Sequence, residues 1–231
     1  MKLELKNIKK NVLFNNQQIS ILKDVSMTCQ SGQIVVIVGE SGSGKSTLLN
    51  IMSTLDDATA GEYLWKGNNI FSFSKKKQES FLANNIGIVF QQYNLINDMP
   101  ADDNVKIALY VNSEVKKRDR DKKVDEVLDK VGLYDRKKHL PNTLSGGEQQ
   151  RVAIARAIIN NPDIVFADEP TGNVDRDNEE HILNIIREIA NQGKIVVIVT
   201  HSEVVKTFAD KVYRLSDGRL IEETRSEEKL R

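Results

Sequence analysis

Three short apolar runs, rich in β-branched residues, stand out along the chain. They cover residues 34–38, 163–167 and 194–199. Apolar residues follow one another in these runs instead of alternating with polar ones. That pattern predicts strands buried on both faces, as in a parallel sheet covered by helices. Each run is followed by glycine, hydroxyl or acidic residues, at the sheet edge where open α/β sheets bind ligands.

The remaining patterns predict the other parts of the fold. Apolar residues recur at helical spacing from 182 to 189, and Gly193 predicts the end of that helix. Residues 1–30 and 61–70 are typical of shorter strands and turns in a small antiparallel layer. From about 88 to 160 the pattern is mostly helical. We therefore expect a single domain over residues 1–231, with a core lobe of about 1–87 and 161–231 and an inserted helical lobe of about 88–160.

Two segments are densely charged with mixed signs. The first, residues 113–126, is typical of a solvated helix face rather than of a nucleic-acid patch. The second, residues 222–229, is interpreted as a solvated helix or a frayed chain end. Neither segment changes the expected core.

Composition narrows the class of protein. A chain of 231 residues with 39% hydrophobic residues suits one large domain, or one domain with a sizeable inserted lobe. Its 33 basic and 33 acidic residues balance, so we expect no nucleic-acid partner. The single cysteine, Cys29, fits a reducing compartment. Since the N-terminus lacks a signal-peptide pattern and no apolar run is long enough to span a bilayer, we expect a soluble, cytoplasmic protein.

A glycine-rich loop follows the first apolar run. The sequence GESGSGKS at residues 39–46 matches the P-loop pattern, and the preceding strand disfavours the plainer reading as a glycine-rich turn. The glycines let backbone N–H groups surround phosphates, and a helix beginning near Lys45 adds its positive end. Lys45 suits the β- and γ-phosphates, and the Ser46 hydroxyl suits Mg²⁺. The predicted ATP-binding residues of this loop are Gly39, Ser41, Gly42, Ser43, Gly44, Lys45, Ser46 and Thr47.

Two carboxylates, Asp168 and Glu169, follow the second apolar run. A lone acidic pair at such a place is usually a helix cap or a surface charge. Beside a P-loop, the first acid typically holds Mg²⁺ through water, and the second is placed to orient or deprotonate the attacking water. Because phosphoryl transfer depends mostly on positioning and charge stabilisation, we predict a metal-binding role for Asp168 and a catalytic role for Glu169.

A third motif, LSGGEQQR at residues 144–151, opens a segment rich in alanine and isoleucine. Ser145 is suited to the N-cap of a helix there, and the two glycines let another backbone approach closely. The result is a second anion site at a helix N-terminus, with no phosphate of its own chain to fill it.

These three motifs, in this order, resemble those of the ATP-binding cassette (ABC) ATPases, and the resemblance covers nearly the whole chain. It implies an α/β fold with a RecA-like P-loop core, an antiparallel β layer and an inserted helical lobe. It also implies that two copies enclose two ATP molecules head to tail, the P-loop of one copy facing the LSGGEQQR motif of the other. The expected cofactors are ATP and Mg²⁺. The expected partners are a second copy and an integral-membrane permease, which would hold the chain at the inner face of the cell membrane.

The resemblance also assigns roles to further residues. Gln91 matches a glutamine that contacts Mg²⁺ and the attacking water, and His201 matches a histidine that contacts the γ-phosphate. Ser145, Gly147 and Asp175 match positions that contact the ATP of the partner subunit. The expected catalytic residues are therefore Glu169, His201 and Gln91, and the expected metal site comprises Ser46, Gln91 and Asp168.

Residues 90–96 and 167–173 resemble one branch of this family, whose permeases carry large extracytoplasmic domains. We therefore expect an ATPase that powers export or membrane removal of an amphipathic compound or antimicrobial peptide. Two alternatives stay open: the ATPase of a non-transporting signalling complex that activates cell-wall hydrolases, and a soluble ABC ATPase that acts on ribosomes or DNA.

Two regions depart from the family pattern. Its members stack adenine on an aromatic residue near the N-terminus, where this chain has Val12. Phe14 is the nearest aromatic residue and is the candidate for that contact; weak stacking is the alternative. Residues 97–100 also differ from the usual loop after Gln91, a region that normally faces the permease.

Overall fold

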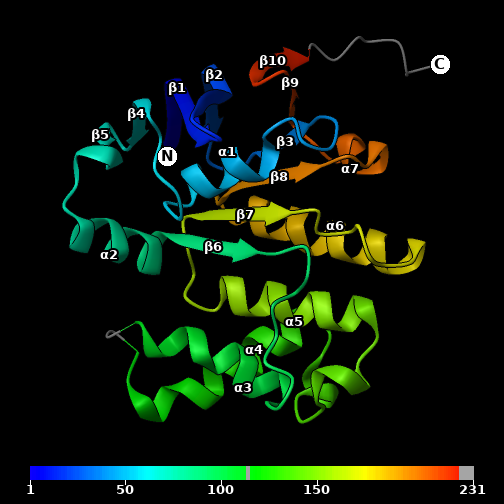
Figure 1. Ribbon diagram of the computed structural model, residues 1–231. Helices are drawn as coiled ribbons and strands as arrows, with labels where there is room; N and C mark the ends of the chain where they lie inside the picture. Colours follow the sequence, from blue (N-terminus) through cyan, green and yellow to red (C-terminus); the bar gives the residue numbers. More distant parts are fainter. Residues whose placement is uncertain (113–114, 224–231) are drawn as a thin grey trace.

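The computed structural model describes residues 1–112 and 115–223 and is built around a six-stranded sheet (Figure 1). The strand order is β10-β9-β3-β8-β7-β6, and every neighbouring pair is parallel except β10 and β9. The strands are β3 (Ile34–Val38), β6 (Ile86–Val89), β7 (Ile164–Asp168), β8 (Ile195–Thr200), β9 (Lys211–Ser216) and β10 (Arg219–Glu223). The three apolar runs are its central strands, so the predicted parallel sheet is confirmed.

Both faces of this sheet are covered, which explains why its central strands are continuously apolar. In β3, Ile34 and Val36 enter a core that also contains side chains of the helices on that face, whereas Val35 and Ile37 enter the core on the opposite face. Successive side chains of a strand point to opposite faces, so a strand covered on both sides has no position left for polar residues.

A second, antiparallel sheet covers one face, as predicted. Its strand order is β2-β1-β4-β5, formed by β1 (Lys2–Phe14), β2 (Gln17–Gln30), β4 (Ala60–Trp65) and β5 (Asn68–Asn69). Cys29 lies in β2 and is fully buried, and this burial raises the pKa of its thiol to about 12. A thiol in such surroundings is inert packing rather than a nucleophile.

Helices lie on both faces of the six-stranded sheet. The buried side chains of α1 and α2 enter the core shared with the antiparallel sheet, and those of α3 to α7 enter the core on the other face. Beyond β6, α3, α4 and α5 lie together (Figure 1). The α-helices are α1 (Lys45–Met52), α2 (Lys75–Asn85), α3 (Ala101–Lys106), α4 (Arg120–Lys130), α5 (Gly146–Ile158), α6 (Arg176–Asn191) and α7 (Glu203–Thr207). Short 3₁₀ helices cover Ile70–Ser72, Ile107–Tyr110, Lys117–Asp119, Tyr134–Arg136 and Pro141–Thr143. The helix expected at 182–189 is part of α6, and Gly193 follows its end with a φ of 83°.

The structure corrects several expected boundaries. The segment expected to be helical from about residue 88 begins with the last part of β6, because Ile86–Val89 pairs with β7, and its first helix starts at Ala101. Glu222 and Glu223 belong to β10 rather than to a charged helix, while residues 224–229 of that segment lie outside the described residues. The division of the chain into two lobes stays a prediction.

The charged segment at 113–126 forms a solvated helix face only from Arg120 on, where α4 begins; before it lie the buried Val115 and the 3₁₀ helix Lys117–Asp119. Residues 113 and 114 lie outside the described part; beyond them, α4 buries Val124, Val127 and Leu128, and most of its charged side chains are exposed. Within residues 1–112 and 115–223, no helix combines the length and the apolar character needed to cross a membrane.

Candidate functional site

The P-loop joins β3 to α1 and uses its glycines for their backbone freedom. Gly42 and Gly44 have φ values of 80° and 104°, in the left-handed region that side chains disfavour. At Gly39, a Cβ would collide with the carbonyl oxygen of Leu215 in β9. The loop can therefore turn beside the sheet edge and enter α1 at Lys45, as the motif predicts.

Two polar groups of the loop are arranged to meet an anion. The ammonium of Lys45 donates to the carbonyl oxygens of Gly39 (2.7 Å) and Glu40 (2.8 Å), so it lies across the loop. The hydroxyl oxygen of Ser43 is buried and has no hydrogen-bond partner within the described residues. A buried hydroxyl without a partner is costly, and a phosphate oxygen in the loop would supply one.

A cleft of about 660 Å³ brings together five distant parts of the chain. It is lined by Ile21 of β2, by the P-loop, by Gln91 after β6, by the acids at the end of β7 and by His201 after β8. Its lining residues are Ile21, Ser41, Gly42, Gly44, Lys45, Ser46, Thr47, Gln91, Asp168, Glu169 and His201. The carboxyl ends of parallel strands meet at one edge of a sheet, which is why residues far apart in sequence converge here.

Asp168 is half-buried in the cleft, and this burial raises the pKa of its carboxyl group. The neighbouring charge of Glu169 raises this pKa further, whereas the hydrogen bond from Ser46 and the charge of Lys45 lower it. A half-buried carboxylate bonded to a hydroxyl is an oxygen pair of the kind that Mg²⁺ prefers. Ser46 and Asp168 therefore fit the metal that usually accompanies a bound triphosphate, with Gln91 in the same cleft as a further oxygen donor.

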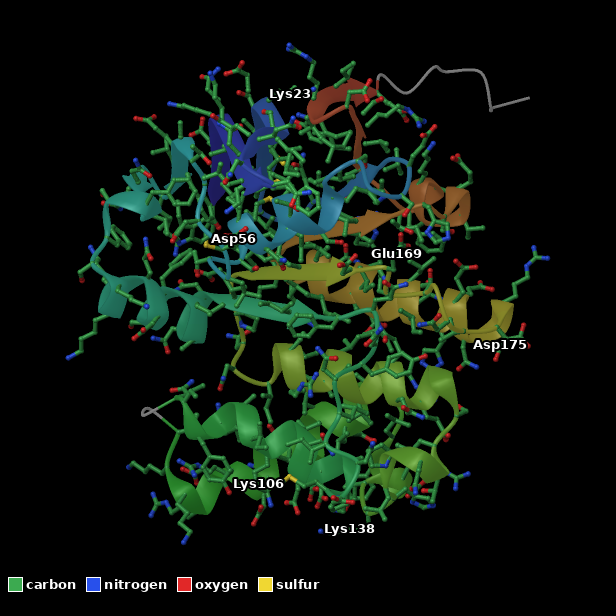
Figure 2. The ribbon with its side chains drawn as sticks, viewed as in Figure 1. Lys23, Asp56, Lys106, Lys138, Glu169 and Asp175 are labelled. Atoms are coloured by element: carbon green, nitrogen blue, oxygen red, sulfur yellow. The ribbon has the colours of Figure 1, made fainter. Side chains whose placement is uncertain are left out.

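Glu169 is held more tightly than any sequence pattern indicated. Its side chain is only 10% exposed, and one carboxylate oxygen, Oε2, accepts hydrogen bonds from the Thr200 hydroxyl (2.7 Å) and the His201 N–H (3.3 Å). The other oxygen, Oε1, lies 2.7 Å from Nδ1 of His201. Its backbone φ is 45°, a strained value of the kind that clusters at functional sites. Figure 2 shows Glu169 at the end of β7.

The segment after Gln91 is fixed by a guanidinium from α5. Arg156 donates to the carbonyl oxygens of Tyr93 (2.6 Å) and Asn94 (2.5 Å). The backbone of these two residues has positive φ angles, 59° at Tyr93 and 50° at Asn94. Burial of this guanidinium lowers its pKa. Asn173, in the segment that leads to α6, donates to the carbonyl oxygen of Gln91 (3.3 Å). The Gln91 segment is therefore joined both to α5 and to the segment before α6.

Ser145 caps α5 as the sequence predicts. Its hydroxyl accepts from the Glu148 N–H (3.2 Å), while the Ser145 N–H donates to the Glu148 carboxylate (2.8 Å), which completes a capping box. The hydrogen bond from the Ser145 backbone is the main reason why the pKa of Glu148 is lowered. Ser145 and Gly147 do not line the cleft described above.

The N-terminal turns of α5 and α6 meet at Asn178, a residue that the sequence analysis did not identify. A Cβ at Gly147 would collide with the Asn178 side chain, so only glycine allows this contact. Asn178 accepts from the Arg151 guanidinium (2.9 Å) and donates to the Asp175 carboxylate (2.8 Å). Asp175 is the N-cap of α6 (Figure 2). This junction, which we call the Asn178 junction, joins the LSGGEQQR helix to Asp175.

Phe14 is not among the residues that line the cleft. It lies at the end of β1, opposite Gln17, and its side chain is 62% exposed. Val12 pairs with Ile19 two residues earlier, and the cleft wall nearest this hairpin is formed by Ile21. The contact of Phe14 with adenine stays a prediction.

Comparison with known proteins agrees with this geometry. The family model described as "ABC transporter" matches residues 22–172, and the chain therefore belongs to the ABC transporter family. The dimeric ATP-binding cassette MJ0796, solved in a post-hydrolysis state bound to ADP and Pi, superimposes with a TM-score of 0.88 at 38% identity over 96% of this chain and 98% of that one. The fold is thus that of an ABC cassette, and the chain is an ATPase that uses ATP with Mg²⁺.

Two relatives show how much of a longer and of a similarly sized family member this chain covers. The macrolide export ATP-binding/permease protein MacB of Bartonella henselae is 40% identical over 222 residues, which are 95% of this chain but 33% of MacB. The ABC transporter ATP-binding protein MJ1508 of Methanocaldococcus jannaschii is 40% identical over 220 residues, which are 95% of this chain and 98% of that protein. The chain thus spans about a third of MacB and nearly all of MJ1508.

Proposed function

We propose that this chain is the ATP-hydrolysing subunit of a bacterial ABC transporter that exports an amphipathic compound or antimicrobial peptide, or removes it from the membrane, through a separate permease. The observation that carries the proposal is the single cleft in which the P-loop, Gln91, both acids and His201 meet. The printed name of MacB, which includes both export and a permease, supports the transport role. The permease would hold this chain on the cytoplasmic face of the membrane.

Within that cleft we assign the roles by position. The P-loop and Lys45 bind the triphosphate, and Ser46 and Asp168, with Gln91, hold Mg²⁺. Glu169, which lines the same cleft as Lys45 and Ser46, orients the attacking water and accepts its proton. His201, whose side chain is 72% exposed, contacts the γ-phosphate. The metal contributes charge neutralisation at the phosphates.

The second part of the proposal is a homodimer. Ser145 and Gly147 form an anion-binding helix N-terminus that does not line the cleft of its own chain. Asp175 lies beside them through the Asn178 junction. These three residues would therefore contact the ATP of the partner subunit. The dimeric form of the related cassette MJ0796 supports this arrangement.

A permease contact is proposed at the loop after Gln91. Asn104 in α3 is buried and clamps this loop: its Oδ1 accepts from the Ile96 N–H (2.7 Å), and its Nδ2 donates to the carbonyl oxygens of Ile96 (3.0 Å) and Met99 (2.8 Å). The clamp leaves the side chains of Ile96 and Met99 43% and 36% exposed. A rigid loop that presents two apolar side chains suits the docking of another protein.

Glu169→Gln tests the catalytic assignment. The change keeps the shape of the side chain but removes the negative charge and the proton acceptor, so hydrolysis should fall by about 10²-fold or more. ATP binding should persist, because Lys45 and the P-loop are untouched. The variant should elute as a dimer in size-exclusion chromatography when ATP is present, because the closed state lasts longer.

Glu180→Gln, on an exposed position of α6, is the matched control and should behave like the parent in both assays. Hydrolysis by Glu169→Gln at near the parental rate would assign the catalytic role to another group. An inactive variant that binds ATP but stays monomeric would contradict the shared site.

A further inference from the structure

Behind the Glu169 carboxylate lies a group of polar side chains to which no role has yet been assigned. They come from the segment after β7 (Thr171), from the end of β8 and the residues after it (Thr200, Ser202) and from the first turn of α6 (Glu179). Thr200 is fully buried and Thr171 nearly so. Buried hydroxyl groups at a catalytic edge are costly unless their hydrogen bonds are made. Here the hydroxyls donate to the carboxylates of Glu169 and Glu179.

Thr200 fixes which oxygen of Glu169 faces the cleft. Its hydroxyl has a single proton, and that proton is donated to Oε2 of Glu169 over 2.7 Å. The same hydroxyl accepts from the Ser202 N–H over 3.0 Å, so it cannot rotate without losing a second bond. With Oε2 held from behind, Oε1 is the oxygen left for His201 and the cleft.

Glu179 ties the two strand ends together from α6. Its Oε1 accepts from the hydroxyl of Thr171 over 3.0 Å and from the hydroxyl of Ser202 over 3.4 Å. Thr171 is two residues after Glu169, and Ser202 is two residues after Thr200. One carboxylate thus connects the segment that carries the catalytic acid with the segment that carries its hydrogen-bond donor.

We propose that Thr200 and Glu179 are positioning residues for hydrolysis: Thr200 holds Oε2 of Glu169 directly, and Glu179 holds the two segments on which Glu169 and Thr200 lie. The proposal rests on the catalytic role given to Glu169 above. In this arrangement the Glu169 side chain is held in one rotamer, so its carboxylate is already oriented toward the attacking water. A fixed group contributes to phosphoryl transfer in this way.

The first test compares two substitutions of Thr200. Thr200→Val keeps the shape but removes the hydroxyl, and Thr200→Ser keeps the hydroxyl. A hydrogen bond to a charged group is strong enough that kcat should fall about 10- to 100-fold in Thr200→Val. The KM for ATP should stay within about twofold, since the P-loop is unchanged. Thr200→Ser should recover kcat to within a few-fold of the parent, which a purely steric role of Thr200 would not explain.

The second test uses Glu179. Glu179→Gln keeps an acceptor oxygen for Thr171 and Ser202, and Glu179→Ala does not. We expect Glu179→Ala to lower kcat several-fold at an unchanged KM, and Glu179→Gln to stay near the parent. Thr207→Val is the matched control for both tests, because Thr207 is exposed and donates only to the Val204 carbonyl oxygen of its own helix. It should leave kcat unchanged.

The outcomes separate this proposal from the one on which it rests. If Glu169→Gln is inactive but Thr200→Val keeps the parental kcat, the positioning role is wrong and the catalytic assignment stands. If Glu169→Gln is active, both are wrong. A rise in KM without a fall in kcat would also overturn the positioning role. Should Thr200→Val fail to fold in a thermal scan, Glu179→Ala decides: a several-fold fall in kcat that Glu179→Gln does not show supports the proposal, and a parental kcat overturns it.

Discussion

The cleft wall beside the β1–β2 hairpin is aliphatic at the positions nearest the P-loop. Ile21 lines the cleft, and Val12 pairs across the hairpin with Ile19. Phe14 lies two residues beyond Val12, on the same side of the strand, since side chains alternate along β1. At the scale of single residues, the proposed contact with adenine therefore depends on one aromatic ring, that of Phe14.

Replacement of Phe14 tests that contact. Stacking of a base on an aromatic ring contributes about 1–3 kcal/mol, so Phe14→Ala should weaken ATP binding by roughly 5- to 150-fold if the ring supports adenine. The dissociation constant for ATP, measured by calorimetry, gives the answer. Leu13→Ala is the matched control, because Leu13 is an exposed neighbour on the opposite face of β1. An unchanged constant for Phe14→Ala would leave only the aliphatic wall as the base contact.

Between elements, the N-terminal turns of α5 and α6 behave as one unit through the Asn178 junction. Arg151 is 9% exposed, and burial lowers the pKa of its guanidinium. Asn178 is the acceptor for that guanidinium and is also bonded to Asp175. Because a buried charged donor needs its acceptor, this side-chain amide contributes to stability as well as to the geometry of the proposed dimer contact.

Asn178→Ala should destabilise the fold by about 1–3 kcal/mol, because it leaves the Arg151 guanidinium without its acceptor. For a chain of this size, each kcal/mol lowers Tm by about 2–4 °C, which differential scanning calorimetry resolves. In the Glu169→Gln background, the same change should reduce the ATP-dependent dimer. Asn191→Ala at the exposed end of α6 is the control and should leave Tm unchanged. A Tm for Asn178→Ala equal to that of the parent would show that the junction carries no stability.

Across the whole molecule, the cleft lies at the carboxyl ends of the parallel strands, while α3, α4 and α5 lie beyond β6 (Figure 1). The loop after Gln91 runs between these two parts, and Arg156 and Asn104 hold it at either end. A partner that docks on this loop would therefore reach Gln91 through a rigid connection. This is the route by which we expect a permease to influence the cleft.

The docking loop can be tested with two exposed residues. Ile96→Glu with Met99→Glu should abolish co-purification with the cognate permease and leave basal ATP hydrolysis near the parental rate, because neither residue lines the cleft. Leu95 is unsuitable, since it packs against the core and its replacement would disturb folding. Ile221→Glu, an exposed apolar residue of β10, is the control. A permease complex that survives the double change would place the docking site elsewhere.

The sequence by itself determined the nucleotide-binding motifs and the central strands of the sheet. The P-loop, the pair Asp168–Glu169 and the Ser145 cap are local patterns whose geometry follows from glycine freedom, strand burial and helix capping, and the structure shows each where it was expected. Helix α2 and strand β9 were not predicted. The first buries only Phe81, and the second alternates weakly, so neither carries a strong periodic signal.

Only the tertiary structure decided which side chains act on one another across the chain. Nothing in the sequence around Thr200, Glu179 or Asn178 distinguishes them from ordinary polar residues, because their partners lie 31, 8 and 27 positions away. The sequence pattern likewise predicts helix from about residue 88, whereas Ile86–Val89 is a strand, since a four-residue edge strand gains its identity only by pairing with β7. Local sequence patterns specify features whose geometry depends on neighbouring residues, such as the P-loop and the cap of α5. Contacts between elements depend on how the sheet and helices pack, and no single segment of sequence contains that information.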